Sequence, residues 1–125
     1  MKLTKCELEI MNVLWVAGKP LSRADILALS TGKTWKANSL HILLNNMLKK
    51  EAIVADGFVR SGKVWGRLYR PTISLEDYYN ENLFSQTTQK EYPLLLSAMV
   101  NRTDITPEML DQMEGLIQKR KQELS

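Results

Sequence analysis

Residues 35–50 read Trp35-Lys36-Ala37-Asn38-Ser39-Leu40-His41-Ile42-Leu43-Leu44-Asn45-Asn46-Met47-Leu48-Lys49-Lys50. At about 100° per residue, one face of this stretch collects apolar side chains, which predicts a helix with a buried stripe of Leu40, Leu43, Leu44, Met47 and Leu48. A solvated opposite face would normally be rich in Glu and Lys. This one carries amides, a hydroxyl and cations, with no carboxylate before Glu51. Asn pairs with adenine, and Lys and Ser reach guanine or the phosphate backbone, so the pattern is typical of a DNA-recognition helix.

The DNA contacts expected from this helix follow from its polar face. They are Lys36, Asn38, Ser39, His41, Ile42, Asn45, Asn46 and Lys49. Ile42 is apolar in the middle of polar side chains, and the C5-methyl group of thymine is its natural contact in the major groove. His41 flanks the buried stripe, so a packing role on the helix surface stays open beside a phosphate contact.

The chain has 125 residues, enough for one compact domain or for a small domain with an oligomerisation segment. Hydrophobic residues at 44% and charged residues at 25% are typical of an ordinary globular protein. Apolar runs fall far short of the roughly 20 residues that span a bilayer, and the N-terminus lacks a signal-peptide core. The single cysteine, Cys6, cannot form an internal disulfide, which favours a cytoplasmic protein and a small core residue over a redox sensor.

Charge divides the chain into two halves. Residues 1–71 carry 12 Lys and Arg against 5 Asp and Glu, a net charge of +7, whereas residues 72–125 carry 5 against 9, a net charge of −4. This asymmetry indicates a front half that binds a polyanion and a back half with another role. The basic half is also the one that contains the predicted recognition helix.

Two helix-start signals precede that helix. Thr4 and Glu7 have the spacing of a capping box, and the helix that they begin is expected to end at residues 18–20. A second, shorter helix begins in a similar way at Ser22. Its expected inward-facing residues are Ile26, Leu27 and Leu29. Thr34 is the expected N-cap of the recognition helix, which runs to about residue 51.

The pattern then changes from helical to strand-like. Ile53–Arg60 and Lys63–Arg70 are short runs rich in Val, Phe, Trp and Tyr, separated by Ser61-Gly62, which predicts a β-hairpin. Its expected DNA contacts are Arg60, Lys63 and Arg67. Three helices followed by a basic hairpin predict a winged helix-turn-helix, so the fold class is mainly α with a small β-hairpin wing.

The remaining segment predicts helices that begin near Ser74, Pro93 and Thr106. About 50 residues bury little core by themselves, so a second copy is expected to complete it. The expected dimerisation residues are Leu83, Phe84, Leu95, Met99, Met109, Met113, Leu116 and Ile117. The predicted organisation is a DNA-binding domain over residues 1–73 and an α-helical dimerisation domain over residues 74–125.

The order and spacing of several motifs cover nearly all of residues 3–79. They are Leu3-Thr4-Lys5 with Glu7, Glu9-Ile10-Met11-Asn12-Val13-Leu14-Trp15, Pro20-Leu21-Ser22, Asp25-Ile26, Trp35, Leu43-Leu44-Asn45, Leu48-Lys49-Lys50-Glu51, Tyr69-Arg70-Pro71 and Ser74-Leu75-Glu76-Asp77-Tyr78. In these motifs the chain resembles the penicillinase repressor (BlaI/MecI) family of bacterial transcriptional repressors. The resemblance implies a homodimer that represses an operator with dyad symmetry in double-stranded DNA, controlling an antibiotic-response or β-lactamase-type operon.

The resemblance also implies a membrane-bound sensor protease as a partner. Well-known members contain an Asn-Phe bond that this protease cuts, and the corresponding region here reads Val100-Asn101-Arg102-Thr103. No cofactor or metal site is expected, since the sequence offers no metal-ligand cluster and no dinucleotide fingerprint.

An enzyme is not favoured, because no nucleophile–base–orienter set and no HExxH motif is present. A winged helix that binds another protein, without a specific operator, is the alternative. Charge separates the two hypotheses, since a protein-binding face would not need Lys36, Lys49, Lys50, Arg60, Lys63 and Arg67 all in one half of the chain.

Overall fold

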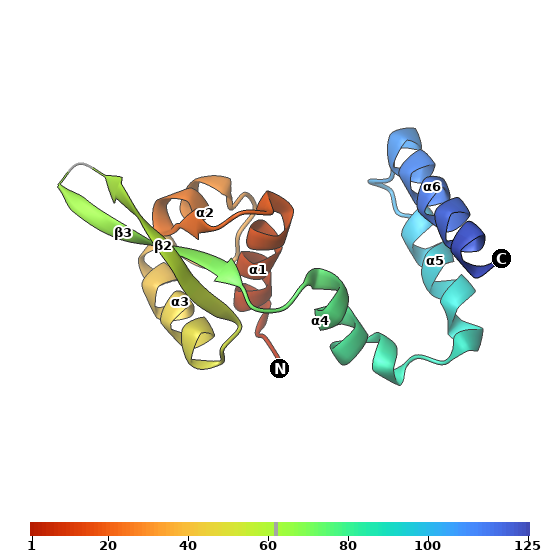
Figure 1. The fold of residues 1–125 in the computed structure, drawn as a ribbon, viewed down its shortest axis with the longest axis horizontal. Coiled ribbons are helices and arrows are strands. Elements are labelled where there is room, and N and C mark those ends of the chain that lie inside the picture. The colour runs from red at the N-terminus through yellow and green to blue at the C-terminus, as the bar shows by residue number, and fades with distance from the viewer. Residues whose placement is uncertain (62) are drawn as a thin grey trace. The chain divides into compact units, whose positions relative to one another are not determined.

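A computed structural model of the chain describes residues 1–61 and 63–125. These residues form two compact units, Met1–Ser85 and Gln86–Ser125 (Figure 1). The first unit contains the helices and the hairpin predicted as a winged helix, and the second is helical.

The first unit is a winged helix with one further helix. Its elements are α1 (Lys5–Ala17), β1 (Leu21–Ser22), α2 (Arg23–Leu29), the 3₁₀ turn η1 (Ala37–Ser39), α3 (Leu40–Lys49), β2 (Ile53–Ser61), β3 (Val64–Pro71) and α4 (Leu75–Asn82). Among the described residues the strands form one antiparallel sheet in the order β1-β3-β2. The fold class expected from the sequence is confirmed.

Both expected capping boxes are present. Thr4 accepts a hydrogen bond from the Glu7 amide at 3.3 Å, and the Thr4 amide donates to the Glu7 carboxylate at 2.9 Å. Ser22 and Asp25 make the same reciprocal pair at 3.1 and 3.2 Å. Each pair satisfies two backbone amides that a helix start leaves without partners. Gly18 then ends α1 with φ +66°, a left-handed conformation that favours glycine.

The core of the first unit lies among α1, α2, α3 and the sheet. Its fully buried side chains include Ile10, Leu14, Leu21, Ile26, Leu40, Leu44 and Met47. Two expectations for α2 were wrong, because Leu27 is 38% and Leu29 54% exposed. A seven-residue helix presents only a narrow stripe to the core, and Ile26 alone occupies it.

The start of the recognition helix differs from the expectation. Thr34 is not its N-cap, because the Thr34 amide and hydroxyl both donate to the Glu9 carboxylate on α1. The chain instead passes through η1 before α3 begins at Leu40. Thr34 therefore fastens the loop before α3 to the first helix.

The sheet contains features that the sequence pattern does not show. β1 has two residues, too few for a periodic signal, and pairs Leu21 with Tyr69 on β3. The hairpin has a bulge between Ala55 and Phe58, where Gly57 takes φ +91°. The predicted strand ends agree with β2 and β3 to within one residue.

Packing of α4 extends the first unit beyond the boundary expected after residue 73. Tyr78 is 5% exposed, and its ring centroid lies 5.7 Å from that of Trp15 on α1. The Trp15 indole N–H donates to the carbonyl of Ile73 at 2.9 Å, and the N-terminal ammonium pairs with Glu81 at 2.9 Å. These contacts hold α4 on α1, so the compact unit reaches Ser85.

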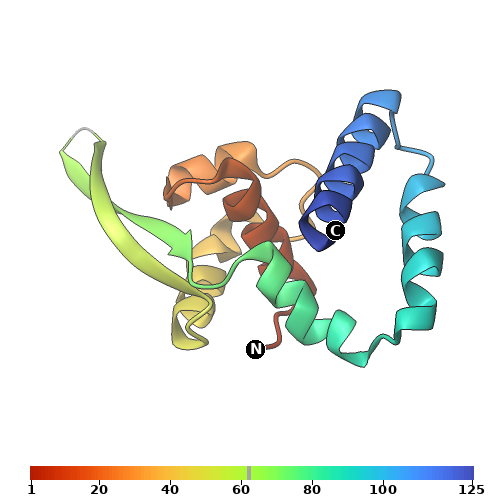
Figure 2. The same ribbon diagram turned by 45° about the vertical axis from the view of Figure 1, so that its right-hand side comes forward.

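The second unit contains η3 (Gln89–Glu91), α5 (Tyr92–Val100) and α6 (Pro107–Leu124), seen from a second direction in Figure 2. Thr106 caps α6 by accepting from the Met109 amide at 3.2 Å, as expected. Every residue from 86 to 125 is described, and none of their side chains is buried. In the described part of the chain, no helix is both long enough and apolar enough to cross a membrane.

Candidate DNA interface

The exposed face of η1 and α3 carries most of the predicted contacts. Asn38, His41, Asn45, Asn46 and Lys49 are exposed, Ser39 is half-buried, and Lys36 is exposed just before η1. Ile42 lies among them and is 54% exposed, although it is a large aliphatic residue. Asn38 and Ser39 belong to η1 rather than to α3, so the first residues of this surface lie on a 3₁₀ turn.

The opposite face of α3 fixes the helix to the protein. Leu40, Leu44 and Met47 are each at most 1% exposed, and Leu43 and Leu48 pack against the same core. Removing such side chains from water contributes about 1.5–3 kcal/mol each. The polar face is therefore displayed by a rigid helix.

The loop before α3 is anchored to α1. Trp35, next to Thr34, is 5% exposed and packs in the core, while the Lys33 ammonium lies 5.6 Å from its ring centroid. Together with the Thr34–Glu9 hydrogen bonds, this packing fixes the point at which the chain enters η1.

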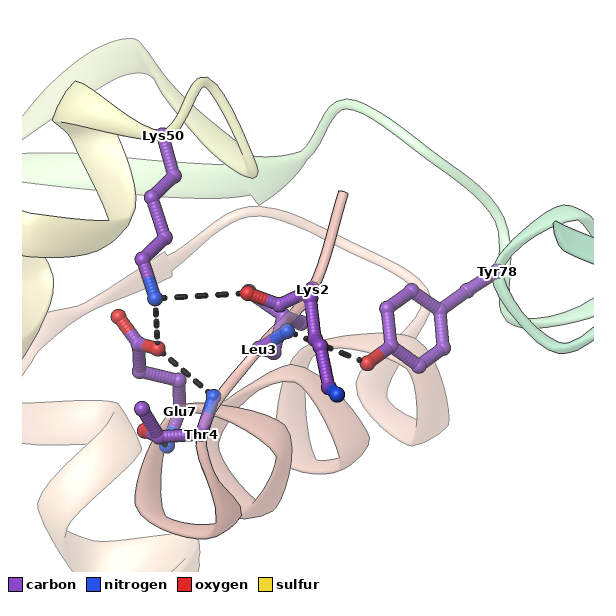
Figure 3. Close-up of polar contacts among 6 residues, drawn as sticks. All are labelled: Lys2, Leu3, Thr4, Glu7, Lys50 and Tyr78. Carbon is purple, nitrogen blue, oxygen red and sulfur yellow. Dashed lines mark hydrogen bonds and ion pairs between the residues drawn. The ribbon is translucent and has the colours of Figure 1, made fainter. Parts of the chain in front are cut away.

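The C-terminal end of α3 is anchored to the start of α1 through an ion pair (Figure 3). The Lys50 ammonium donates to the carboxylate of Glu7, which is 2% exposed, and also to the carbonyl of Lys2 at 3.5 Å. Nearby, the Leu3 amide donates to the Tyr78 hydroxyl at 3.4 Å. Lys50 thus joins the recognition helix to the capping box of α1.

The pKa of Glu7 reflects these contacts. Burial raises the pKa of Glu7. Hydrogen bonds from Lys50 and Thr4, together with the charge of Lys50, lower this pKa by more than burial raises it, so the net pKa lies below the ordinary value for glutamate. The Glu7 carboxylate is therefore ionised at neutral pH. Lys50, one of the cations of the basic half, pairs with the buried Glu7, and its neighbour Lys49 is exposed at the end of α3.

The hairpin formed by β2 and β3, called the wing below, carries the other predicted contacts. Arg60, Lys63 and Arg67 are all exposed. Arg70 pairs with Asp56 at 3.2 Å near the base of the wing. In Figure 1 the strands of the wing extend to the left of α3, whereas α4 lies to the right of α1.

Sequence reasoning missed two exposed aromatic residues of the wing. Phe58 is 63% and Trp65 64% exposed. The sequence pattern contains a signal for them, because alternation along two paired strands places both rings on the same face as Arg60 and Arg67. In the sequence pattern these rings serve only as evidence for strands.

The predicted dimerisation residues fall in both units. Leu83 follows α4 and Phe84 lies in the turn η2 (Phe84–Gln86), whereas Leu95 and Met99 lie on α5 and Met109, Met113, Leu116 and Ile117 on α6. Leu95 and Met113 are half-buried, and the others are exposed, with Leu116 at 68%. The second unit thus leaves several large apolar side chains exposed on α5 and α6.

Comparison with known proteins agrees with this geometry. No curated protein matches the chain. The family model described as penicillinase repressor matches residues 3–119 and so spans the winged helix and nearly all of the helical unit. Members of that family are regulatory DNA-binding proteins rather than enzymes. With nearly its whole length matched, the chain belongs to the penicillinase repressor family of transcriptional repressors.

Proposed function

We propose that this repressor binds a dyad-symmetric operator as a homodimer, with η1 and α3 in the major groove and the wing on the flanking backbone or minor groove. One observation carries the proposal: the exposed face of α3 bears amides, a cation and Ile42, while the other faces of the helix are fixed to the core. The N-terminal end of a recognition helix points at base edges, which favours Asn38, Ser39 and Ile42 as the residues nearest the bases.

The helical unit supports the dimer. Its apolar side chains stay in water in the single chain, and a two-fold partner would cover them. The same symmetry would present two α3 helices to two half-sites. The family further suggests an antibiotic-response or β-lactamase-type operon as the target.

Salt dependence tests the proposal directly. We expect the full-length protein to bind duplex DNA with a steep loss of affinity between 50 and 200 mM salt, because each phosphate contact contributes about −0.9 to the slope of log K against log salt concentration. Fluorescence anisotropy of labelled promoter fragments measures this slope. A flat response, or no binding to any fragment near its own gene, would exclude an operator-binding repressor and favour a protein-binding winged helix.

Ile42 should contribute to sequence specificity. We expect Ile42→Ala to weaken the preferred operator by about 1 kcal/mol or more, a factor of five or greater, without changing non-specific binding, because the variant loses contact with a thymine methyl group. Competition between operator and unrelated duplex gives both affinities. Val16→Ala is the matched control, since Val16 on α1 is 86% exposed. An equal loss on every sequence would mean that Ile42 serves packing.

Lys63 should contact phosphate without distinguishing bases. We expect Lys63→Ala to weaken all duplexes about equally and to lower the salt slope by about one unit. Lys90→Ala, an exposed lysine of the second unit, is the matched control and should leave the slope unchanged. If Lys63→Ala acted at one base pair only, the wing would contribute to base readout at that position.

A further inference from the structure

Beyond its bulge, the wing exposes a mixed aromatic and cationic surface. The register pairs Phe58 with Arg67 and Arg60 with Trp65. Directly opposite residues of an antiparallel pair share a face, and so do residues two apart on one strand. Phe58, Arg60, Trp65 and Arg67 therefore form one surface, called the aromatic–cation face, in which the two rings are diagonal neighbours within reach of each other.

This surface continues the side of the sheet that covers the core. Alternation along β3 places Trp65 and Arg67 on the same side as Tyr69, which packs against the hydrophobic core. Past the bulge at Gly57, the hairpin projects beyond α2 and α3 (Figure 1), and both rings become more than 60% exposed. The wing therefore exposes two large aromatic side chains to solvent, outside the core of the first unit.

Charge indicates what could cover this surface. The sequence from Gly57 to Pro71 contains no Asp or Glu, and its cations are Arg60, Lys63, Arg67 and Arg70. The guanidinium carbon of Arg60 lies 6.0 Å from the Trp65 ring centroid, so a cation accompanies the aromatic ring itself. Cations surrounding apolar rings match the minor groove of DNA, where phosphates flank the sugar and base edges.

We propose that the aromatic–cation face enters the DNA minor groove beside the site of α3, where Trp65 and Phe58 wedge against a base step and bend the operator. This inference rests on the proposed function. Arginine side chains are attracted to the negative potential of a narrow minor groove. Apolar wedges in that groove unstack a base step and kink the duplex toward the major groove, and the bend brings more protein surface into contact with DNA.

Fluorescence energy transfer between dyes at the two ends of an operator duplex tests the bend. Full-length protein should bring the ends closer. Trp65→Ala should abolish most of that change and weaken binding about ten-fold, as expected when a base loses an aromatic contact. Phe58→Ala should reduce both quantities, and Trp65→Phe should restore most of them. Because both rings are largely exposed, thermal unfolding of these variants should match that of the unaltered protein.

Val59→Ala is the matched control, since Val59 pairs with Gly66 on the other face of the wing and is 41% exposed. It should keep the bend and the affinity. An unaltered bend in Trp65→Ala, or equal effects of Trp65→Ala and Val59→Ala, would overturn the inference. If the protein bound duplex DNA with a steep salt dependence but left the duplex straight, the inference about the aromatic–cation face would be wrong, whereas the proposed function would still be supported. Failure of the full-length protein to bind duplex DNA would overturn both.

Discussion

Leu116→Asp in the full-length chain should yield a monomer whose affinity for the operator is about 10²–10⁴-fold lower. Leu116 is 68% exposed on α6, in a unit where no side chain is buried. In the proposed dimer the new carboxylate would have to leave water without a partner, which disfavours association. The second α3 would then no longer bind at the high effective concentration that a dimer provides.

Sedimentation and operator titration measure the two parts of this prediction. Gln118→Asp is the matched control, because it adds the same charge on the opposite face of α6 from Leu116 and should stay dimeric. A chain that ends at Ser85 should retain the winged helix and bind as weakly as Leu116→Asp. Full-length protein that sediments as a monomer at micromolar concentration would contradict the dimer.

The second large effect is expected at Lys50. Lys50→Met should lower the free energy of unfolding by about 2 kcal/mol at pH 7, because the Glu7 carboxylate, 2% exposed, loses its cationic partner. The Lys50 side chain is 37% exposed, so solvent screening holds the loss below the 3–5 kcal/mol typical of fully buried pairs. Lys49→Met is the matched control and should weaken DNA binding while leaving stability nearly unchanged.

The effect of Lys50→Met should depend on pH in a defined direction. Burial raises the pKa of Glu7, but the bonds from Lys50 and Thr4 lower it to a net value below the ordinary one. A lowered folded-state pKa contributes stability above the unfolded value, and this stability is lost as the pH falls through the folded value. The deficit of Lys50→Met should therefore be largest at neutral pH and shrink in acid. Chemical denaturation at several pH values measures it, and a deficit that grew in acid would contradict the ion-pair account.

The sequence was sufficient for the winged-helix fold because its signals are local and strong. Thr4 with Glu7 and Ser22 with Asp25 are short-range caps, and the stripe from Leu40 to Leu48 has one clear period. These features depend on neighbours along the chain. They were confirmed in the structure.

The structure differs from the sequence-based expectations where a residue contacts a partner that is distant in the sequence. Thr34 looks like a helix cap, but Glu9 from α1 binds it. Lys50 counts from the sequence among the cations of the basic half, but it pairs with Glu7 on α1. Tyr78 looks like the start of a separate domain, but it is buried on Trp15. In each case an interaction across at least 25 residues determines the role, and periodicity within a short window cannot show it.

The DNA contacts themselves remain predictions, supported by exposure and charge. The structure exposes Asn38 on η1, Ile42 and Asn45 on α3, and Arg60 and Arg67 on the wing. It also adds Phe58 and Trp65, whose role depends on which face of the hairpin they share.

Protection of guanine N7 from methylation tests the central claim most directly, because this atom lies in the major groove. The operator can be obtained by selecting duplexes from a random pool with the full-length protein. If two α3 helices occupy the major groove, guanines in two half-sites related by a dyad should be protected, with two chains bound per duplex. Protection should weaken for Leu116→Asp. Unprotected guanines throughout a saturated duplex, or one chain bound at a single unrepeated site, would contradict the account.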